Sequence, residues 1–565
     1  MSESPPDLSP DAVVSNPAKP SVPSQSQIRN RARKARVEGA LLLFLLLILA
    51  IGCRAARFPV EWPAHPGIMT VSPTVDRCDP PSMDELWHLT LSTGRGSPFF
   101  AYPRDTLVHD VPAWTSMDGA KPWWAVWTNM RDVTHPPLYV TTLRLWRDAF
   151  GGSDGVALAC SVAWSCAAIV FLFLAVRLAA GRPAAFWAAA VLAVSPAATY
   201  YALEMRSYAM LTAEAAAAVW MMVRLTQHGS RWRDVTGLCV VLLAAMLTHY
   251  FSVFACLMAG AYTLAIARRR WPGVLLAGAI TGGVYAAIWL PFALQQLHFA
   301  REGIDFLHTE ERSWAYLSRL AAALPMRLLA ESWSRPPLVV SAAIGVTILI
   351  AVIVAAVRRP TVRPFLVWYV GVVGFLFASD VLLRTQQVAF IRYPGAAQPA
   401  AAAFVPLIFA TLLRGRWAVH VAGVAVCAGI LLMQPDALHN DAPTWTTAVS
   451  RIVERIKPGD VLLVSADVPP GKSEYRTEAL ILEFAHVPGV FPRDAAILYK
   501  PISPDLAAQL AGRRAWLLTT GGADETPKFT PGARVVERFD YWQNLSANGP
   551  TNGYLLEFPP TQPAN

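Results

Sequence analysis

Apolar residues fall in long blocks along most of the chain, and short polar or basic segments separate these blocks. The blocks are about 17 to 25 residues long, which is the length that an α-helix needs to cross the hydrocarbon core of a bilayer. We therefore predict an α-helical polytopic membrane protein. The eleven expected spans lie, within several residues, at 38–54, 155–177, 184–200, 207–225, 235–249, 251–267, 273–293, 337–357, 364–383, 391–412 and 417–434.

The positions of the arginines predict the orientation of these spans. The first apolar block follows the basic segment "RNRARKAR" and has no clear small-residue cleavage site after it, so we interpret it as an uncleaved span that begins in the cytoplasm. Every dense arginine cluster between later spans then falls on the cytoplasmic side, where Lys and Arg are retained. These clusters are Arg177/Arg182, Arg224/Arg231/Arg233, Arg268/Arg269/Arg270, Arg358/Arg359/Arg363 and Arg414/Arg416.

Three regions follow from this topology. Residues 1–37 are rich in Pro and Ser and then basic, which predicts a disordered cytoplasmic N-terminus. Residues 38–434 form the transmembrane domain, and its large first outer loop, 55–154, mixes Trp, Pro and charge in a way that favours helices at the headgroup level. Residues 435–565 are expected outside the membrane as a small α/β domain. In it "WTTAVSRIVERI" is helical in pattern, and "GDVLLVSAD" and "RRAWLLTT" are typical of buried strands.

The composition agrees with a membrane protein and argues against a nucleic-acid partner. The chain is 54% hydrophobic and 15% charged, with a mean hydropathy of +0.37 and a net charge of +9. The basic residues are scattered between apolar blocks, so the net charge reflects topology, and we expect no nucleic-acid partner. The seven cysteines show no CxxC or Cys/His metal pattern. The Arg/Ala-rich composition favours a bacterial inner membrane, with the C-terminal domain in the periplasm.

Five polar segments interrupt the apolar sequence, and the predicted topology places all five on the outer side. They are "SMDELWHL", "RDVTHPPLY", "YYALEMRSYAM", "LTHYF" and "RTQQVAFIRYPG". Each has a structural explanation of its own, such as a helix start, a proline turn, a surface ion pair or side chains that extend to the headgroups. Their common placement on one face favours a site that is reached from that face. Glu214 lies within a span, and its role is left open.

The order of these segments resembles that of the polytopic glycosyltransferases of the GT-C superfamily. The resemblance covers roughly residues 80 to 400. Within the superfamily, the chain most resembles the branch of protein O-mannosyltransferases and aminoarabinose transferases. Its segment "DVTHPPLY" is similar to the first-loop motif of the mannosyltransferases. It implies a sugar donor on a polyprenyl phosphate in the outer leaflet and an inverting transfer to an extracytoplasmic glycan, lipid or protein. The chain has Tyr139 and Val140 where the protein mannosyltransferases have Gly and Lys, so the resemblance gives no support to a Ser/Thr protein acceptor.

The resemblance also assigns residues to the site. Asp84 aligns with the acid that acts as general base, and Glu85 is its supporting neighbour. His135 belongs to the second loop motif with Asp132 just ahead of it. Arg392 and Tyr393 stand where the family faces the lipid phosphate.

Physical chemistry explains these residue types. The donor is already activated, so catalysis needs a carboxylate that takes the proton of the attacking hydroxyl and cations that hold the departing phosphate. Arg392 is the first choice for the phosphate because its planar fork suits phosphate geometry. Arg206 and Lys121 are weaker candidates, and Tyr208 would stack on a sugar face or anchor at the membrane interface.

Two alternatives remain open from the sequence. A divalent metal would take its ligands from Glu85, Glu204, His135 and His249, although no tight ligand spacing requires one. A transporter or flippase of a lipid-linked sugar is the alternative function, and Glu214 is the feature that favours it. A membrane sensor with an outer ligand domain would rest on the C-terminal segment alone.

Overall fold

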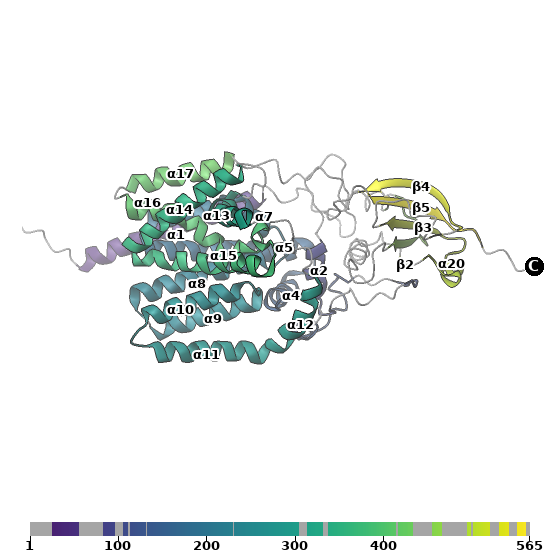
Figure 1. The fold of residues 1–565 in the computed structure, drawn as a ribbon, viewed down its shortest axis with the longest axis horizontal. Coiled ribbons are helices and arrows are strands. Elements are labelled where there is room, and N and C mark those ends of the chain that lie inside the picture. The colour runs from purple at the N-terminus through teal and green to yellow at the C-terminus, as the bar shows by residue number, and fades with distance from the viewer. Residues whose placement is uncertain are drawn as a thin grey trace, which may run out of the picture. The chain divides into compact units, whose positions relative to one another are not determined.

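The computed structural model of the chain (Figure 1) describes most of the helical region and part of the C-terminal region. The described residues are 25–55, 83–96, 105–110, 114–130, 133–229, 231–303, 314–330, 337–413, 416–432, 452, 455–465, 494–498, 501–519, 530, 532–541 and 551–560. The chain divides into two compact units, Met1–Leu45 and Leu46–Asn565. The described residues of the first unit form the start of helix α1 (Gln25–Ala55), and all other elements belong to the second.

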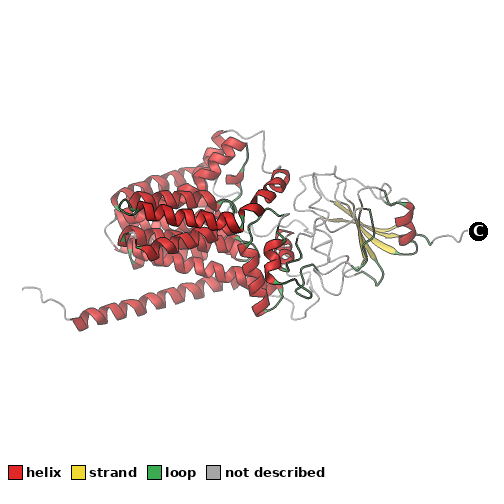
Figure 2. Cartoon of the chain, turned by 90° about the horizontal axis from the view of Figure 1, so that it is seen from below, coloured by secondary structure: helices red, strands yellow, loops and turns green. Residues whose placement is uncertain are grey.

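The second unit contains a bundle of long apolar helices that pack side by side (Figures 1 and 2). In the described part of the chain, seven helices are long and apolar enough to cross a membrane, or eight if the bent pair α6 and α7 is one span. The bundle helices are α5 (Asp154–Ala180), α6 (Arg182–Val194), α7 (Pro196–Ala202), α8 (Tyr208–His228), α9 (Trp232–Thr248), α10 (Ser252–Ile266), α11 (Trp271–Ile288), α12 (Leu290–Gly303), α13 (Trp314–Ala330), α14 (Leu338–Arg358), α15 (Arg363–Leu383), α16 (Gln398–Leu412) and α17 (Arg416–Leu432).

This bundle confirms the predicted class of helical membrane protein, and each predicted span overlaps α1 or one of the bundle helices. The number of spans stays a prediction, because α9, α10 and α17 have only 17, 15 and 17 residues and are not among the helices long enough to cross a membrane. Helix α13 was not predicted, since Pro325 and two arginines, Arg319 and Arg327, interrupt its 17 residues. The predicted span 273–293 is divided at Trp289, where α11 ends and α12 begins.

The predicted span 184–200 is broken in the structure. Helices α6 and α7 meet at a bend of 62°, and Pro196 at the start of α7 cannot donate a backbone hydrogen bond to α6. Ser195 caps α7 by accepting from the backbone N–H of Ala198, and the buried guanidinium of Arg54 donates to the carbonyl of Ala193. The polar groups that the break exposes are thus satisfied within the bundle.

The first outer loop contains the helices expected there: α2 (Met83–Ser92), α3 (Trp123–Thr128) and α4 (Leu138–Phe150). Arg147 of α4 is buried and connects the pieces of this loop. Its guanidinium donates to Leu89 O and Ser92 Oγ at the end of α2 and to Thr115 O farther along the loop. Such hydrogen bonds to a buried charged group fix the loop as a folded structure that presents α2 in one orientation.

The described C-terminal residues form a five-stranded mixed sheet in the order β2-β1-β3-β5-β4. Strands β1 and β3 confirm the two predicted strands, and they pair in parallel with each other. The predicted helix "WTTAVSRIVERI" lies largely outside the described residues. The elements are β1 (Val461–Ser465), β2 (Asp494–Leu498), α20 (Pro504–Leu510), β3 (Arg514–Thr519), β4 (Arg534–Tyr541) and β5 (Thr551–Glu557).

A segment of the first outer loop joins this sheet. Val108 forms an antiparallel bridge with Ala495 of the edge strand β2, with backbone hydrogen bonds of 2.8 and 3.0 Å. Leu107 is buried in the hydrophobic core of the sheet, and His109 lies 3.2 Å from Asp494. The small outer domain therefore includes residues that precede the predicted boundary at 435.

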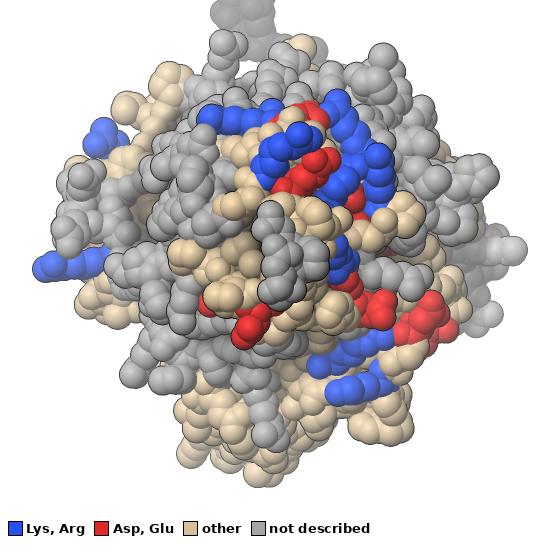
Figure 3. Space-filling view, turned by 90° about the vertical axis from the view of Figure 1, so that its right-hand side faces the viewer, with Lys and Arg blue, Asp and Glu red and all other residues tan. Residues whose placement is uncertain are grey.

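Charged side chains on the face of the molecule at the right of Figure 1 are interspersed in sign (Figure 3). Several of the charges of the sheet form ion pairs, such as Arg513 with Asp494 at 2.7 Å and Arg534 with Glu557 at 2.8 Å. The Arg534–Glu557 pair is exposed, and such pairs contribute little to stability. At the ends of the bundle helices, by contrast, charged side chains from distant parts of the sequence come together in one cluster.

Candidate active site

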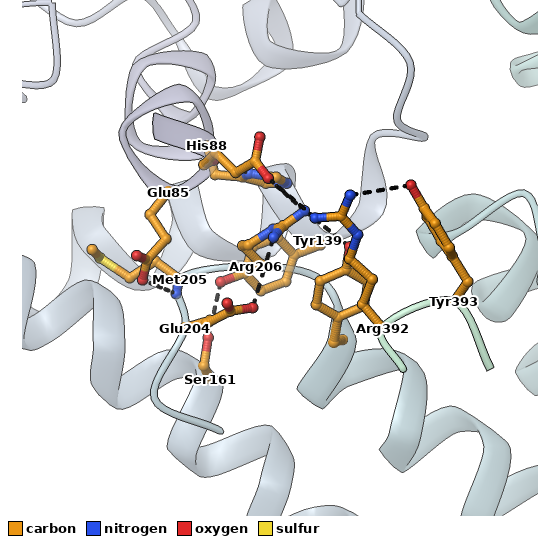
Figure 4. Close-up of polar contacts among 11 residues, drawn as sticks. Glu85, His88, Tyr139, Ser161, Glu204, Met205, Arg206, Arg392 and Tyr393 are labelled. Carbon is orange, nitrogen blue, oxygen red and sulfur yellow. Dashed lines mark hydrogen bonds and ion pairs between the residues drawn. The ribbon is translucent and has the colours of Figure 1, made fainter. Parts of the chain in front are cut away.

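One carboxylate oxygen lies between two guanidinium groups from distant parts of the sequence. Asp84 Oδ2, in the first turn of α2, is 2.9 Å from Arg206 Nη2 and 4.0 Å from Arg392 Nη1. Arg206 precedes α8, and Arg392 lies between α15 and α16. Figure 4 shows the two guanidinium groups converging from their separate elements. Three of the five polar segments therefore meet at one point, as the predicted common face requires.

The charge of Asp84 is set by these neighbours. Burial alone would raise the pKa of its carboxyl, but Arg206 and Arg392 lower that pKa below its ordinary value of 3.8. The carboxylate is thus ionised at neutral pH, and its side chain is still 38% exposed. Its neighbour Glu85 is buried and accepts a hydrogen bond of 2.8 Å from the backbone N–H of Met205 (Figure 4). Glu85 thereby fixes α2 against the connection between α7 and α8.

Arg206 is held by partners on three sides. Besides Asp84, its Nη2 donates to the hydroxyl of Tyr208 at 2.9 Å, and its Nη1 lies 3.9 Å from Glu204 Oε2. Burial would lower the pKa of Arg206, but Asp84, Tyr208 and Glu204 raise it above its ordinary value. Burial raises the pKa of Glu204 to about 7, although Arg206 opposes this change. The site therefore holds one carboxylate that is firmly ionised and one that titrates near neutral pH.

Arg392 lies on the connection between α15 and α16. Its guanidinium stacks over the rings of Phe390 and Tyr393, and its Nη2 donates to the hydroxyl of Tyr393 at 3.3 Å. Asp380, at the end of α15, accepts hydrogen bonds from the backbone N–H groups of Gln387 and Val388 at 2.7 and 2.8 Å. This buried carboxylate fixes the connection that carries Arg392, a role that the sequence analysis did not assign.

Three histidines line the same site. The ring of His135 lies 5.3 Å from that of His88 and 6.2 Å from that of His249. Burial lowers the pKa of His88 and of His249 to about 4, and it lowers the pKa of His135 well below its ordinary value. The imidazoles are therefore neutral at neutral pH. The Nδ1 of His88 donates to Asp84 O, and the Nδ1 of His249 accepts from the backbone N–H of Phe251.

Among the residues that the structure describes, no three His, Cys, Asp or Glu side chains form a group that could hold a metal ion. Glu85 is engaged with Met205, and Glu204 lies beside Arg206, so two of the four expected ligands face other partners. The arrangement of these residues does not fit the metal alternative raised from the sequence. No step of the chemistry below is derived through a metal.

The remaining predicted residues are only partly accounted for. Tyr208 accepts a hydrogen bond from Arg206, and Tyr393 accepts one from Arg392. Lys121 is exposed, and its backbone N–H donates to Thr93 O, away from the Asp84 contacts described above. Asp132 lies outside the described residues. The sequence analysis missed Gln296, which donates to His135 O at 3.2 Å and so holds the proline-rich turn; an amide within the apolar run of α12 was its only signal.

Comparisons with known proteins agree with this architecture. The model of the family described as dolichyl-phosphate-mannose-protein mannosyltransferase matches residues 134–293. The crystal structure of ArnT from Cupriavidus metallidurans bound to undecaprenyl phosphate is similar, with 12% identity and a TM-score of 0.50 over 91% of this chain and 97% of that chain. Residues 134–293 thus resemble this family, and the chain shares the fold of ArnT.

The oligosaccharyltransferase of Archaeoglobus fulgidus, in complex with Zn and sulfate, matches with 12% identity and a TM-score of 0.43 over 85% of this chain and 67% of that one. No curated protein sequence matches the chain. At these identities the similarity to solved structures concerns the fold, so the chemistry has to be argued from the residues of the site.

Proposed function

We propose that the chain is an inverting glycosyltransferase that moves a sugar from a polyprenyl-phosphate donor to an acceptor outside the cytoplasm. The observation that carries the proposal is the placement of Asp84 against Arg206 and Arg392 at one end of an apolar bundle. A carboxylate beside two guanidinium groups supplies the two functions that the reaction needs, a proton acceptor and an anion binder. The ArnT structure with undecaprenyl phosphate supports a lipid phosphate as the ligand.

The proposed reaction proceeds in one displacement. An acceptor hydroxyl attacks the anomeric carbon of the sugar, and a new carbon–oxygen bond forms as the bond from that carbon to the phosphate oxygen breaks. The lipid phosphate leaves with the bonding electron pair, and its negative charge is stabilised by Arg206 and Arg392. Asp84 takes the proton of the acceptor hydroxyl. Attack from the face opposite the phosphate inverts the configuration at the anomeric carbon.

The test separates binding from turnover in the purified full-length protein. Asp84→Asn should lower transfer of radiolabelled sugar from a panel of undecaprenyl-phosphate sugars by at least about 100-fold, which is the lower range of a positioned base. It should retain binding of undecaprenyl phosphate. Arg392→Ala should weaken that binding, because it removes a cation from the phosphate position.

Asp148→Asn is the matched control. Asp148 is 40% exposed and pairs with Arg144 on α4, so its replacement should leave both binding and transfer unchanged. Full transfer by Asp84→Asn would exclude Asp84 as the base. Failure of the native protein to bind undecaprenyl phosphate would remove the proposed donor class.

A flippase for a lipid-linked sugar is the second candidate, and the 62° break between α6 and α7 favours it, because broken helices are frequent in transporters. Reconstitution in liposomes distinguishes the two functions. A flippase would move the labelled lipid between leaflets with its sugar still attached. The proposed transferase would release undecaprenyl phosphate and label the acceptor.

A further inference from the structure

Asp84 contacts both arginines through a single oxygen. Arg206 Nη2 and Arg392 Nη1 approach this Oδ2 atom from the α7–α8 and α15–α16 connections, at 2.9 and 4.0 Å. An oxyanion between two guanidinium groups on separate elements is also the arrangement expected for a phosphate oxygen. The base and the leaving group of the proposed reaction thus require the same two cations.

The two arginines do not depend on Asp84 for their positions. Arg206 also donates to Tyr208 at 2.9 Å and lies near Glu204, while Arg392 donates to Tyr393 and stacks over Phe390. If Asp84 leaves, these contacts still hold both guanidinium groups in place. The cations therefore form a preorganised pair, and Asp84 is one of several partners that they can have.

Asp84 has the freedom to leave. Its side chain is 38% exposed, whereas that of Arg206 is only 9% exposed. It belongs to the first turn of α2, which Glu85 holds through a separate hydrogen bond to Met205. Rotation of the Asp84 side chain therefore requires no movement of the helix. A phosphate monoester has more negative charge and more acceptor oxygens than a carboxylate, so it competes favourably for two arginine forks.

We propose that Asp84 occupies the phosphate position of the donor-free site and that the lipid phosphate displaces it from Arg206 and Arg392 on binding. This inference rests on the proposed function, because it takes a polyprenyl phosphate as the ligand. Asp84 then has a second role as an internal competitor of the donor. While its carboxylate is bound to the two arginines, Asp84 is not available as the catalytic base. It becomes available when a phosphate replaces it as their partner.

The exchange also changes the chemistry of Asp84. The two arginines lower its pKa in the donor-free site, whereas burial alone would raise it. Displacement by the phosphate removes the direct contacts to the cations. The carboxylate becomes a stronger base at the time when an activated sugar is present.

The test compares the affinities of full-length variants for undecaprenyl phosphate in detergent micelles, with thermal unfolding to confirm that each variant is folded. Asp84→Asn should bind at least about fivefold more tightly than the native protein, which is the lower range for coupling between two ligands that exclude each other. The gain should disappear in the double variant Asp84→Asn/Arg206→Ala. Asp84→Ser serves as a second variant should the asparagine destabilise the fold.

Asp148→Asn is the matched control for charge. It removes one negative charge from α4, where Asp148 pairs with Arg144 rather than with the arginines of the site. Its affinity should stay within about twofold of the native value, because an exposed and screened charge has a small effect. Equal tightening by Asp148→Asn would reduce the effect to general electrostatics and overturn the exchange, as would unchanged or weaker binding by Asp84→Asn.

The outcomes also separate the two proposals. A native protein that does not bind undecaprenyl phosphate contradicts the proposed function itself. A native protein that binds it, together with an Asp84→Asn variant that gains no affinity, contradicts only the exchange.

Discussion

Glu204 is the acidic residue of the site whose charge depends most directly on burial. It is 8% exposed, and burial raises its pKa to about 7 from an ordinary value of 4.5. Between these two pH values the folded protein binds more protons at this position than the unfolded chain does. Stability is therefore lost as the pH rises through this window, by up to roughly 3 kcal/mol.

Replacement of Glu204 by glutamine should remove this dependence. Glu204→Gln has no charge to bury, so its apparent melting temperature should exceed that of the native protein at pH 8 and approach it near pH 5. The measurement is thermal unfolding of the detergent-solubilised protein between pH 5 and pH 8. A melting-temperature difference that stays constant with pH would show that Glu204 does not titrate in this range.

Sequence reasoning found the residues of the site better than it found their partners. Asp84 and Arg392 were named through the family resemblance, and Arg206 was named as a weaker candidate for binding the phosphate. Their pairing could not be predicted, since the two arginines are 186 residues apart and no local pattern joins them. Arg206 was ranked below Arg392, yet it makes the shorter contact to Asp84.

At the scale of elements, the connection between α15 and α16 determines where Arg392 lies. Asp380 accepts from Thr385 Oγ1 at 2.6 Å as well as from two backbone N–H groups, and Arg384 beside it has the left-handed φ of 53°. A carboxylate with several donors fixes a backbone that would otherwise be flexible. Asp380 thus determines the position of Arg392, the proposed phosphate-binding cation, without contacting the ligand itself.

Asp380→Asn tests this positioning role. An asparagine presents an amide N–H₂ where one oxygen now accepts, so the variant should lose about 1–3 kcal/mol of stability. It should also raise the KM for the lipid-linked donor more than it lowers kcat, because Arg392 moves while Asp84 stays in place. Steady-state kinetics measure both constants. A loss confined to kcat would contradict the prediction, and Asp148→Asn again serves as the unaffected control.

The long apolar helices were predictable from the sequence, whereas helix α13 and the break between α6 and α7 were not. Long apolar blocks such as those of α5 and α14 predict membrane-spanning helices by their length and hydropathy. The break at Pro196 is stabilised by Arg54, which lies 139 residues from the carbonyl of Ala193 that it caps. Helix α13 packs against α14 so closely that Gly345 approaches the carbonyl oxygen of Ala322. The break between α6 and α7 and the packing of α13 depend on contacts between residues far apart in the sequence, so the local sequence pattern could not predict them.

At the scale of the whole molecule, the arginine distribution predicts which side of the membrane the site faces. We expect Lys121, in the first outer loop, on the extracytoplasmic side and Arg231, between α8 and α9, in the cytoplasm. In a variant without native cysteines, a membrane-impermeant maleimide should label Lys121→Cys in intact spheroplasts. Arg231→Cys should react only after permeabilisation. The reverse labelling pattern would place the site in the cytoplasm and exclude an outer-leaflet donor.

The strand bridge at Val108 has a consequence for biosynthesis. Leu107 is buried against the sheet, whose strand β5 begins at Thr551, 444 residues later in the chain. At translation rates of about 5–20 residues per second, roughly 20 to 90 s pass between the synthesis of these two partners. The apolar side chain of Leu107 has no native core to enter during that interval. This segment is synthesised early but is therefore among the last to mature, and a chaperone on its side of the membrane would encounter it unprotected.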